Sequence, residues 1–78
     1  MKKLIMVPNG WKCVFRQCPP GFFVYHNALC MKSEYKSEEL GDEAYCESGE
    51  AFWGGTDNKN DRDNLEVQPV APKWVDEE

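Results

Sequence analysis

Residues 44–53 read Ala-Tyr-Cys-Glu-Ser-Gly-Glu-Ala-Phe-Trp and carry the clearest fold signal in the chain. Two runs, Ala44–Glu47 and Glu50–Trp53, contain residues that favour strands, and Ser48-Gly49 separates them. Glycine readily takes the positive φ that a tight hairpin turn requires. The segment therefore predicts two antiparallel strands joined by a turn at Ser48-Gly49.

The rest of the chain contains short β-prone runs separated by turn residues, without the periodicity of a long helix. His26-Asn27 predicts a two-residue turn, because Asn tolerates the left-handed region. The polar segments 36–42 and 56–64 predict loops, the second with at most one helical turn. The further strands that we expect are Lys12–Gln17, Phe22–Tyr25, Ala28–Tyr35 and Leu65–Gln68.

Six short strands joined by local turns predict an all-β fold, either a small antiparallel SH3-like barrel or a twisted sheet of five to six strands. With 78 residues the chain holds one domain. We expect an N-terminal arm at 1–11, a β domain at 12–69 and an acidic, extended tail at 70–78, with Trp74 free to pack against the body. The predicted core consists of Val14, Phe22, Val24, Leu29, Met31, Tyr45, Phe52, Leu65 and Val67.

Adjacent aromatic residues predict a second apolar surface. Neighbouring residues of a strand face opposite sides, so Phe22 and Phe23 cannot share one core, and neither can Phe52 and Trp53. In the strand that follows, Leu29 and Met31 fall on the predicted core side, with Cys30, Lys32 and Glu34 opposite. The resulting prediction is a partner-binding patch made of Phe23, Tyr25 and Trp53. The alternative is that the N-terminal arm or the Trp74 tail covers these rings.

The four cysteines are Cys13, Cys18, Cys30 and Cys46. A structural zinc site usually has two close pairs of ligands, and here only Cys13 and Cys18 are close, although His26 and Cys30 make a substitute second pair. Two disulfides are a further alternative. We favour four reduced thiols that behave as small hydrophobic residues, with no metal and no cofactor.

The charge is unevenly distributed. Residues 1–33 contain five bases and no acid, whereas residues 34–78 contain four bases and all fourteen acids, and the net charge is −5. The negative net charge makes direct binding to nucleic acid unfavourable. It is also small for a protein that would mimic the charge of DNA. The apolar run Leu4–Val7 is too short for a secretory signal, and no run approaches the ~20 residues of a membrane helix. We therefore expect a cytoplasmic protein without membrane contact.

The inventory of reactive side chains argues against an enzyme. His26 is the single histidine and falls in a predicted turn. A Cys30/His26 nucleophile pair would still need an orienting group and an oxyanion site. The adjacent carboxylates Glu38 and Glu39 fall in a predicted polar loop, so we do not expect them to act as a paired acid and base.

Several motifs together resemble a group of small uncharacterised proteins of tailed bacteriophages and prophages. They lie within residues 12–70 and comprise Pro19-Pro20-Gly21-Phe22-Phe23, Lys32-Ser33-Glu34-Tyr35, Ala44-Tyr45, Ser48–Thr56 and Asp63–Pro69. The resemblance implies a phage or prophage origin, a place in the host bacterial cytoplasm and a compact β domain. It implies no catalytic residue.

Two classes of function fit these observations. The first is a phage-encoded module that docks on and modulates a host protein, as the small size, the spare aromatic residues and the acidic second half suggest. The second is a structural or virion accessory protein that buries its apolar face against copies of itself. A zinc-stabilised small domain is the lesser alternative.

Overall fold

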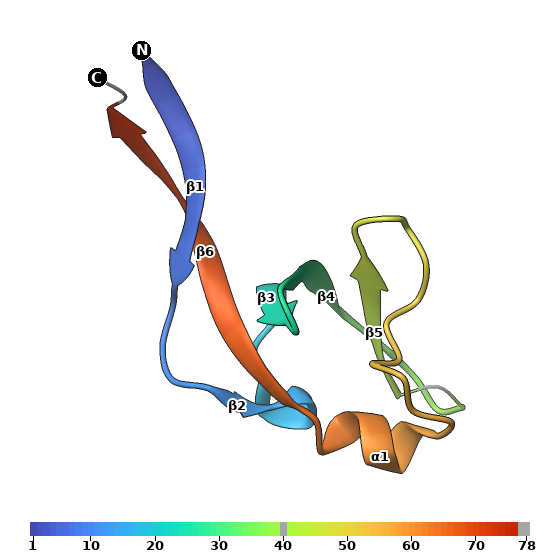
Figure 1. Ribbon diagram of the computed structural model, residues 1–78. Helices are drawn as coiled ribbons and strands as arrows, with labels where there is room; N and C mark the ends of the chain where they lie inside the picture. The colour runs from blue at the N-terminus through green and yellow to red at the C-terminus, as the bar shows by residue number, and fades with distance from the viewer. Residues whose placement is uncertain (40, 77–78) are drawn as a thin grey trace.

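The computed structural model describes residues 1–39 and 41–76, which form one antiparallel sheet with very little helix. The elements are β1 (Lys2–Pro8), β2 (Cys13–Val14), the 3₁₀ helix η1 (Phe15–Gln17), β3 (Gly21–Tyr25), β4 (Ala28–Ser37), β5 (Gly41–Cys46), α1 (Lys59–Asp63) and β6 (Glu66–Asp76). Figure 1 shows the strands in the order β1-β6-β3-β4-β5, with β2 paired to β6 beside this path. The all-β prediction is confirmed, and the sheet is open, with β1 and β5 at its ends.

Both predicted turns are present, but the predicted strand Glu50–Trp53 is reduced to a single bridge between Ala51 and Tyr45. His26 and Asn27 have φ values of 48° and 65° and close the hairpin of β3 and β4, as a two-residue turn of this type requires. Gly49 has a φ of 89°, which also agrees with the prediction. Here the loop is one residue longer than predicted, because the Cys46 N–H donates to the Glu50 carbonyl at 2.8 Å and so encloses residues 47–49.

The boundaries of several elements differ from the prediction. Only Cys13–Val14 of the first predicted strand pairs with β6, and Phe15–Gln17 turns into η1. The predicted loop at 36–42 is shortened by both of its flanking strands, and 56–64 contains the short helix α1. No helix in the described residues is long and apolar enough to cross a membrane.

The predicted arm and tail form a paired ribbon instead of two free segments. β1 pairs with the C-terminal part of β6 in an unbroken register from Lys2↔Asp76 to Pro8↔Val70. This arm ribbon, residues 2–8 with 70–76, projects from the body in Figure 1 and gives the molecule extents of 47 × 24 × 21 Å. The tail prediction is therefore corrected for residues 70–76, whereas residues 77–78 lie outside the described part. The apolar run Leu4–Val7 within β1 favours this pairing.

The core lies on the opposite face of β3 from the one predicted. Its centre is a triangle of rings in which Phe15 lies 5.6 Å from Phe23 and 5.3 Å from Phe52, and Phe23 lies 5.0 Å from Phe52. Cys18, Cys30, Ala44 and Val67 complete it. Phe52 and Val67 are buried as predicted. The other predicted core residues are not among the buried residues, although Leu65 packs against the core: Val14, Phe22, Val24, Leu29, Met31, Tyr45 and Leu65.

Candidate protein-binding surface

The predicted patch of Phe23, Tyr25 and Trp53 does not exist as an exposed surface. Phe23 is fully buried, Tyr25 packs edge-on against Phe52 with ring centroids 5.5 Å apart, and Trp53 is half-buried beneath the guanidinium of Arg62 at 4.7 Å. Strand residues alternate between faces, so assigning Phe22 to the core placed every side chain of β3 on the wrong face of the sheet. Phe23 faces inward because the ring of Phe15 packs against it on the inner face of the sheet.

The exposed apolar face of the sheet consists instead of several residues that the sequence predicted for the core. Phe22 lies opposite Met31, and Met31 lies opposite Tyr45, so the three form a row across β3, β4 and β5. With Leu29 they line a hollow of about 220 Å³, which we call the outer-face groove. Met31 and Tyr45 expose 42% and 38% of their surface, so the groove is open to a partner.

A signal for this arrangement was present in the sequence. Cys30 and Ala44, the buried residues of β4 and β5 next to the groove, are small, and their size leaves room for the three phenylalanine rings. The larger residues Met31 and Tyr45 alternate with them and face outward. The polar Lys32, on the same face as Cys30, concealed this pattern.

Lys32 is buried because its ammonium group is surrounded by acceptors. It donates to the carbonyls of Phe15 and Cys18 at 2.7 Å each and lies 3.3 Å from the Asp42 carboxylate. Its Nζ also lies 4.7 Å from the centre of the Phe15 ring. Lys32 therefore has a structural role: it joins the sheet to η1 through the carbonyls of Phe15 and of Cys18, the residue that follows η1.

The cysteines form two spatial pairs. Cys30 lies directly opposite Cys46, and Cys18 lies near Cys13. Burial, together with the neighbouring thiol, raises the pKa of Cys18 to about 11 and that of Cys30 to about 12. No three His, Cys, Asp or Glu side chains of residues 1–39 and 41–76 are grouped so that they could hold a metal ion.

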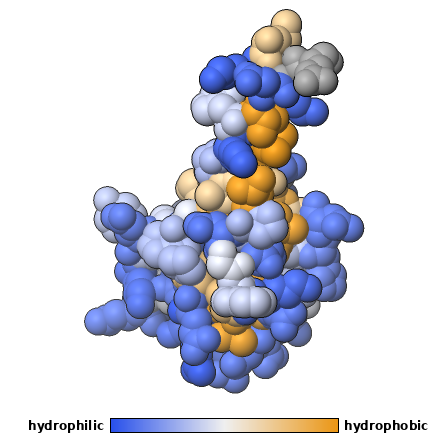
Figure 2. All heavy atoms as spheres, turned by 90° about the vertical axis from the view of Figure 1, so that its left-hand side faces the viewer, coloured by the Kyte–Doolittle hydropathy of each residue, from blue (hydrophilic) through white to orange (hydrophobic). Residues whose placement is uncertain are grey.

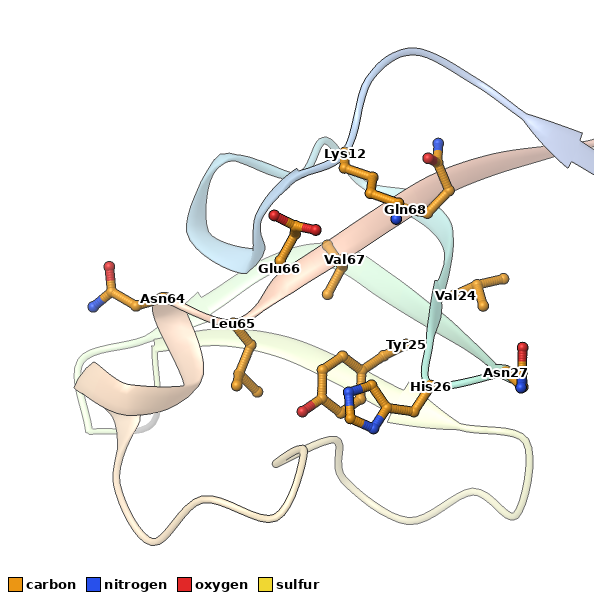
Figure 3. Close-up of a pocket in the computed structure, with 10 residues that line it drawn as sticks. All are labelled: Lys12, Val24, Tyr25, His26, Asn27, Asn64, Leu65, Glu66, Val67 and Gln68. Atoms are coloured by element: carbon orange, nitrogen blue, oxygen red, sulfur yellow. The ribbon is translucent and has the colours of Figure 1, made fainter.

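A second hollow, of about 530 Å³, lies where β3 and β6 diverge beyond their two paired positions, and Figure 3 shows its lining. The His26 ring stacks on Tyr25 with centroids 4.1 Å apart, while Lys12 and Glu66 line the same hollow. The stacking gives His26 a packing role at the turn where the sequence placed it.

Comparison of the chain with protein-family models, with curated proteins and with solved structures found no match in any of the three.

Proposed function

We propose that this chain is a non-catalytic protein-binding module, of phage origin, that docks on and modulates a host protein through the outer-face groove. The observation that carries the proposal is the row formed by the half-buried Phe22 and the exposed Met31 and Tyr45 on three hydrogen-bonded strands. Aromatic and methionine side chains on a rigid support are frequent anchors of protein interfaces. The phage origin rests on the sequence resemblance alone.

The chemistry of the groove defines the partner that would fit it. Its lining is apolar except for Glu47 at one end. A partner segment with one or two large apolar side chains and a neighbouring lysine or arginine would complement both features. The acidic balance of residues 34–78 would also attract a basic partner and increase its association rate.

The proposal can be tested by affinity capture from a lysate of the host bacterium, with the wild-type protein compared with variants of the groove. Tagged wild-type protein should retain a host protein that the double variant Met31→Ser/Tyr45→Ser does not retain. Tyr35→Ser is the matched control, because Tyr35 is 73% exposed and lies outside the groove. Capture of the same proteins by the wild type and the double variant would refute a role for the groove.

A structural or virion accessory homo-oligomer is the second candidate, because the groove residues Met31 and Tyr45, like two residues of the arm ribbon, are exposed apolar side chains that a second copy could cover. Leu4 and Trp74 lie opposite one another on the ribbon, yet they are 47% and 63% exposed. Size-exclusion chromatography of the groove variant separates the two functions. Self-association that depends on Met31 and Tyr45 would support the structural protein, because it would occupy the groove.

A further inference from the structure

We propose that two copies of this chain pair through the outer edge of β1, so that their arm ribbons merge into one four-stranded antiparallel sheet. An isolated two-stranded ribbon is marginally stable in water, whereas three or more strands with an apolar face are stable. Figure 2 shows hydrophobic side chains that follow the arm ribbon outward from the body. A second copy would supply the missing strands.

The register shows which backbone groups of β1 are available. The Asn9 N–H donates to the Pro69 carbonyl at 2.9 Å, and the pairing continues without interruption to Lys2↔Asp76. Because hydrogen-bonded and non-hydrogen-bonded pairs alternate, Lys3, Ile5 and Val7 bond to β6. Leu4 and Met6 therefore direct their N–H and C=O groups away from β6, toward the open edge.

The other edges of the sheet are less suited to pairing. In the arm ribbon, Pro72 lies opposite Met6, so its nitrogen occupies an outward position of β6 and supplies no N–H. At the far end of the sheet, β5 is already covered, since Tyr45 bridges to Ala51 and the Phe52 N–H donates to the Ala44 carbonyl. The β1 edge, in contrast, directs the N–H groups of both Leu4 and Met6 outward.

A two-fold axis through Ile5 gives the most extensive pairing. Ile5 is the central residue of Lys2–Pro8, so full overlap of two antiparallel β1 strands places Ile5 opposite its own copy. Leu4 then forms a hydrogen-bonded pair with Met6 of the second copy. The outward N–H and C=O groups of both residues thereby gain partners. Lys3 lies opposite Val7, and Lys2 opposite Pro8, so the lysines of the two chains are kept apart.

Merging the ribbons also brings together their apolar residues. Leu4, Met6, Pro72 and Trp74 share one face of the ribbon, since residues opposite each other in an antiparallel pair point to the same side. In the dimer this face would be doubled across the axis. The outer-face groove lies on β3, β4 and β5 and stays free for a host protein, so the dimer does not depend on the proposed function.

Sedimentation of Met6 variants tests the edge pairing. Met6→Pro removes an outward N–H without removing a bond between β1 and β6, and Met6→Val removes the same side chain but keeps the N–H. We expect wild type and Met6→Val to sediment as dimers and Met6→Pro as a monomer with an unchanged circular dichroism spectrum. A monomeric wild type, or a Met6→Pro dimer as stable as the wild type, would overturn the proposal.

Site-specific crosslinking tests the register and does not rely on a proline variant. Under mild oxidation with diamide, Ile5→Cys should form a disulfide-linked dimer, because residues at the axis face each other in a non-hydrogen-bonded pair. Lys2→Cys is the control, since two copies of residue 2 lie at opposite ends of the paired strands. Equal crosslinking of the two variants, beyond that of the wild type, would refute this register.

Discussion

The ammonium group of Lys32 lies 3.3 Å from the carboxylate of Asp42, and both side chains are buried against the inner face of the sheet. Two backbone carbonyls, those of Phe15 and Cys18, accept further hydrogen bonds from the same nitrogen at 2.7 Å. Such a buried charge is stable because its donors are satisfied. The position of η1, and hence of Phe15, depends on this arrangement.

Replacing Lys32 by methionine should destabilise the protein strongly. The variant retains the length of the side chain but leaves the Asp42 carboxylate and two carbonyls buried without their donor. Breaking a buried ion pair in this way costs about 3–5 kcal/mol. Urea unfolding followed by tryptophan fluorescence measures the change.

Lys36→Met is the matched control for Lys32→Met. Lys36 also lies near Asp42, at 3.6 Å, but its side chain is 77% exposed. Exposed ion pairs contribute about 0–1 kcal/mol, so the control should lose little stability. Similar losses in the two variants would show that Lys32 is not the central contact.

The orientation of β3 predicts unequal losses of stability when two neighbouring phenylalanines are replaced by alanine. Phe23→Ala removes a fully buried ring from the triangle with Phe15 and Phe52 and should cost about 3–5 kcal/mol. Phe22→Ala removes a half-buried ring at the outer-face groove and should cost less than half as much. If Phe22→Ala were the more damaging change in urea unfolding, the register described for β3 would be wrong.

The hairpin at residues 47–49 predicts a modest cost for a side chain at Gly49. Its φ is 89°, and a Cβ at this position would meet nothing within 4 Å, so backbone strain is the main expected effect. Gly49→Val should therefore lose about 1–2 kcal/mol. Gly49→Asn should lose less, because Asn tolerates positive φ. Equal stability of all three proteins in thermal unfolding would contradict the turn.

The buried thiols predict a loss of stability at alkaline pH. In the unfolded chain Cys18 and Cys30 titrate near their ordinary value of 9.0, whereas in the folded protein their pKa values are about 11 and about 12. Between these values the unfolded chain binds fewer protons than the folded protein. The stability that the thiols contribute is therefore complete below pH 9.0 and is lost as pH rises toward about 12.

Comparison with a variant that lacks both thiols separates their effect on stability from that of other groups that titrate in this range. Cys18→Ala/Cys30→Ala should lose less stability than the wild type when urea unfolding at about pH 8 is compared with that at about pH 11. The assay includes a reducing agent, which keeps the thiols of both proteins free. Parallel loss of stability in the two proteins would show that these thiols do not cause the alkaline effect.

The sequence was sufficient to predict the elements that depend on local chemistry. The turn at His26-Asn27 and the positive φ of Gly49 follow from residues that tolerate the left-handed region. The all-β class follows from short β-prone runs between such turns. Phe52 and Val67 are buried as predicted.

The face of β3 and β4 could not be predicted in the same way, because it depends on contacts between distant segments. Alternation shows which residues share a face but not which face is buried. Lys32 made the true core face look polar, since its acceptors in η1 and at Asp42 lie far from it in the sequence. The pairing of β1 with residues 70–76 joins the two ends of the described chain and was missed for the same reason.

The most direct test of the binding function is the affinity of purified groove variants for the host protein captured by the wild type. Isothermal titration calorimetry should show binding that weakens by at least about tenfold, or ~1.4 kcal/mol, in Met31→Ser/Tyr45→Ser and is unchanged in Tyr35→Ser. Urea unfolding of the same samples shows that the variants are folded. Equal affinity of the double variant and the wild type would contradict the claim that the outer-face groove binds the partner.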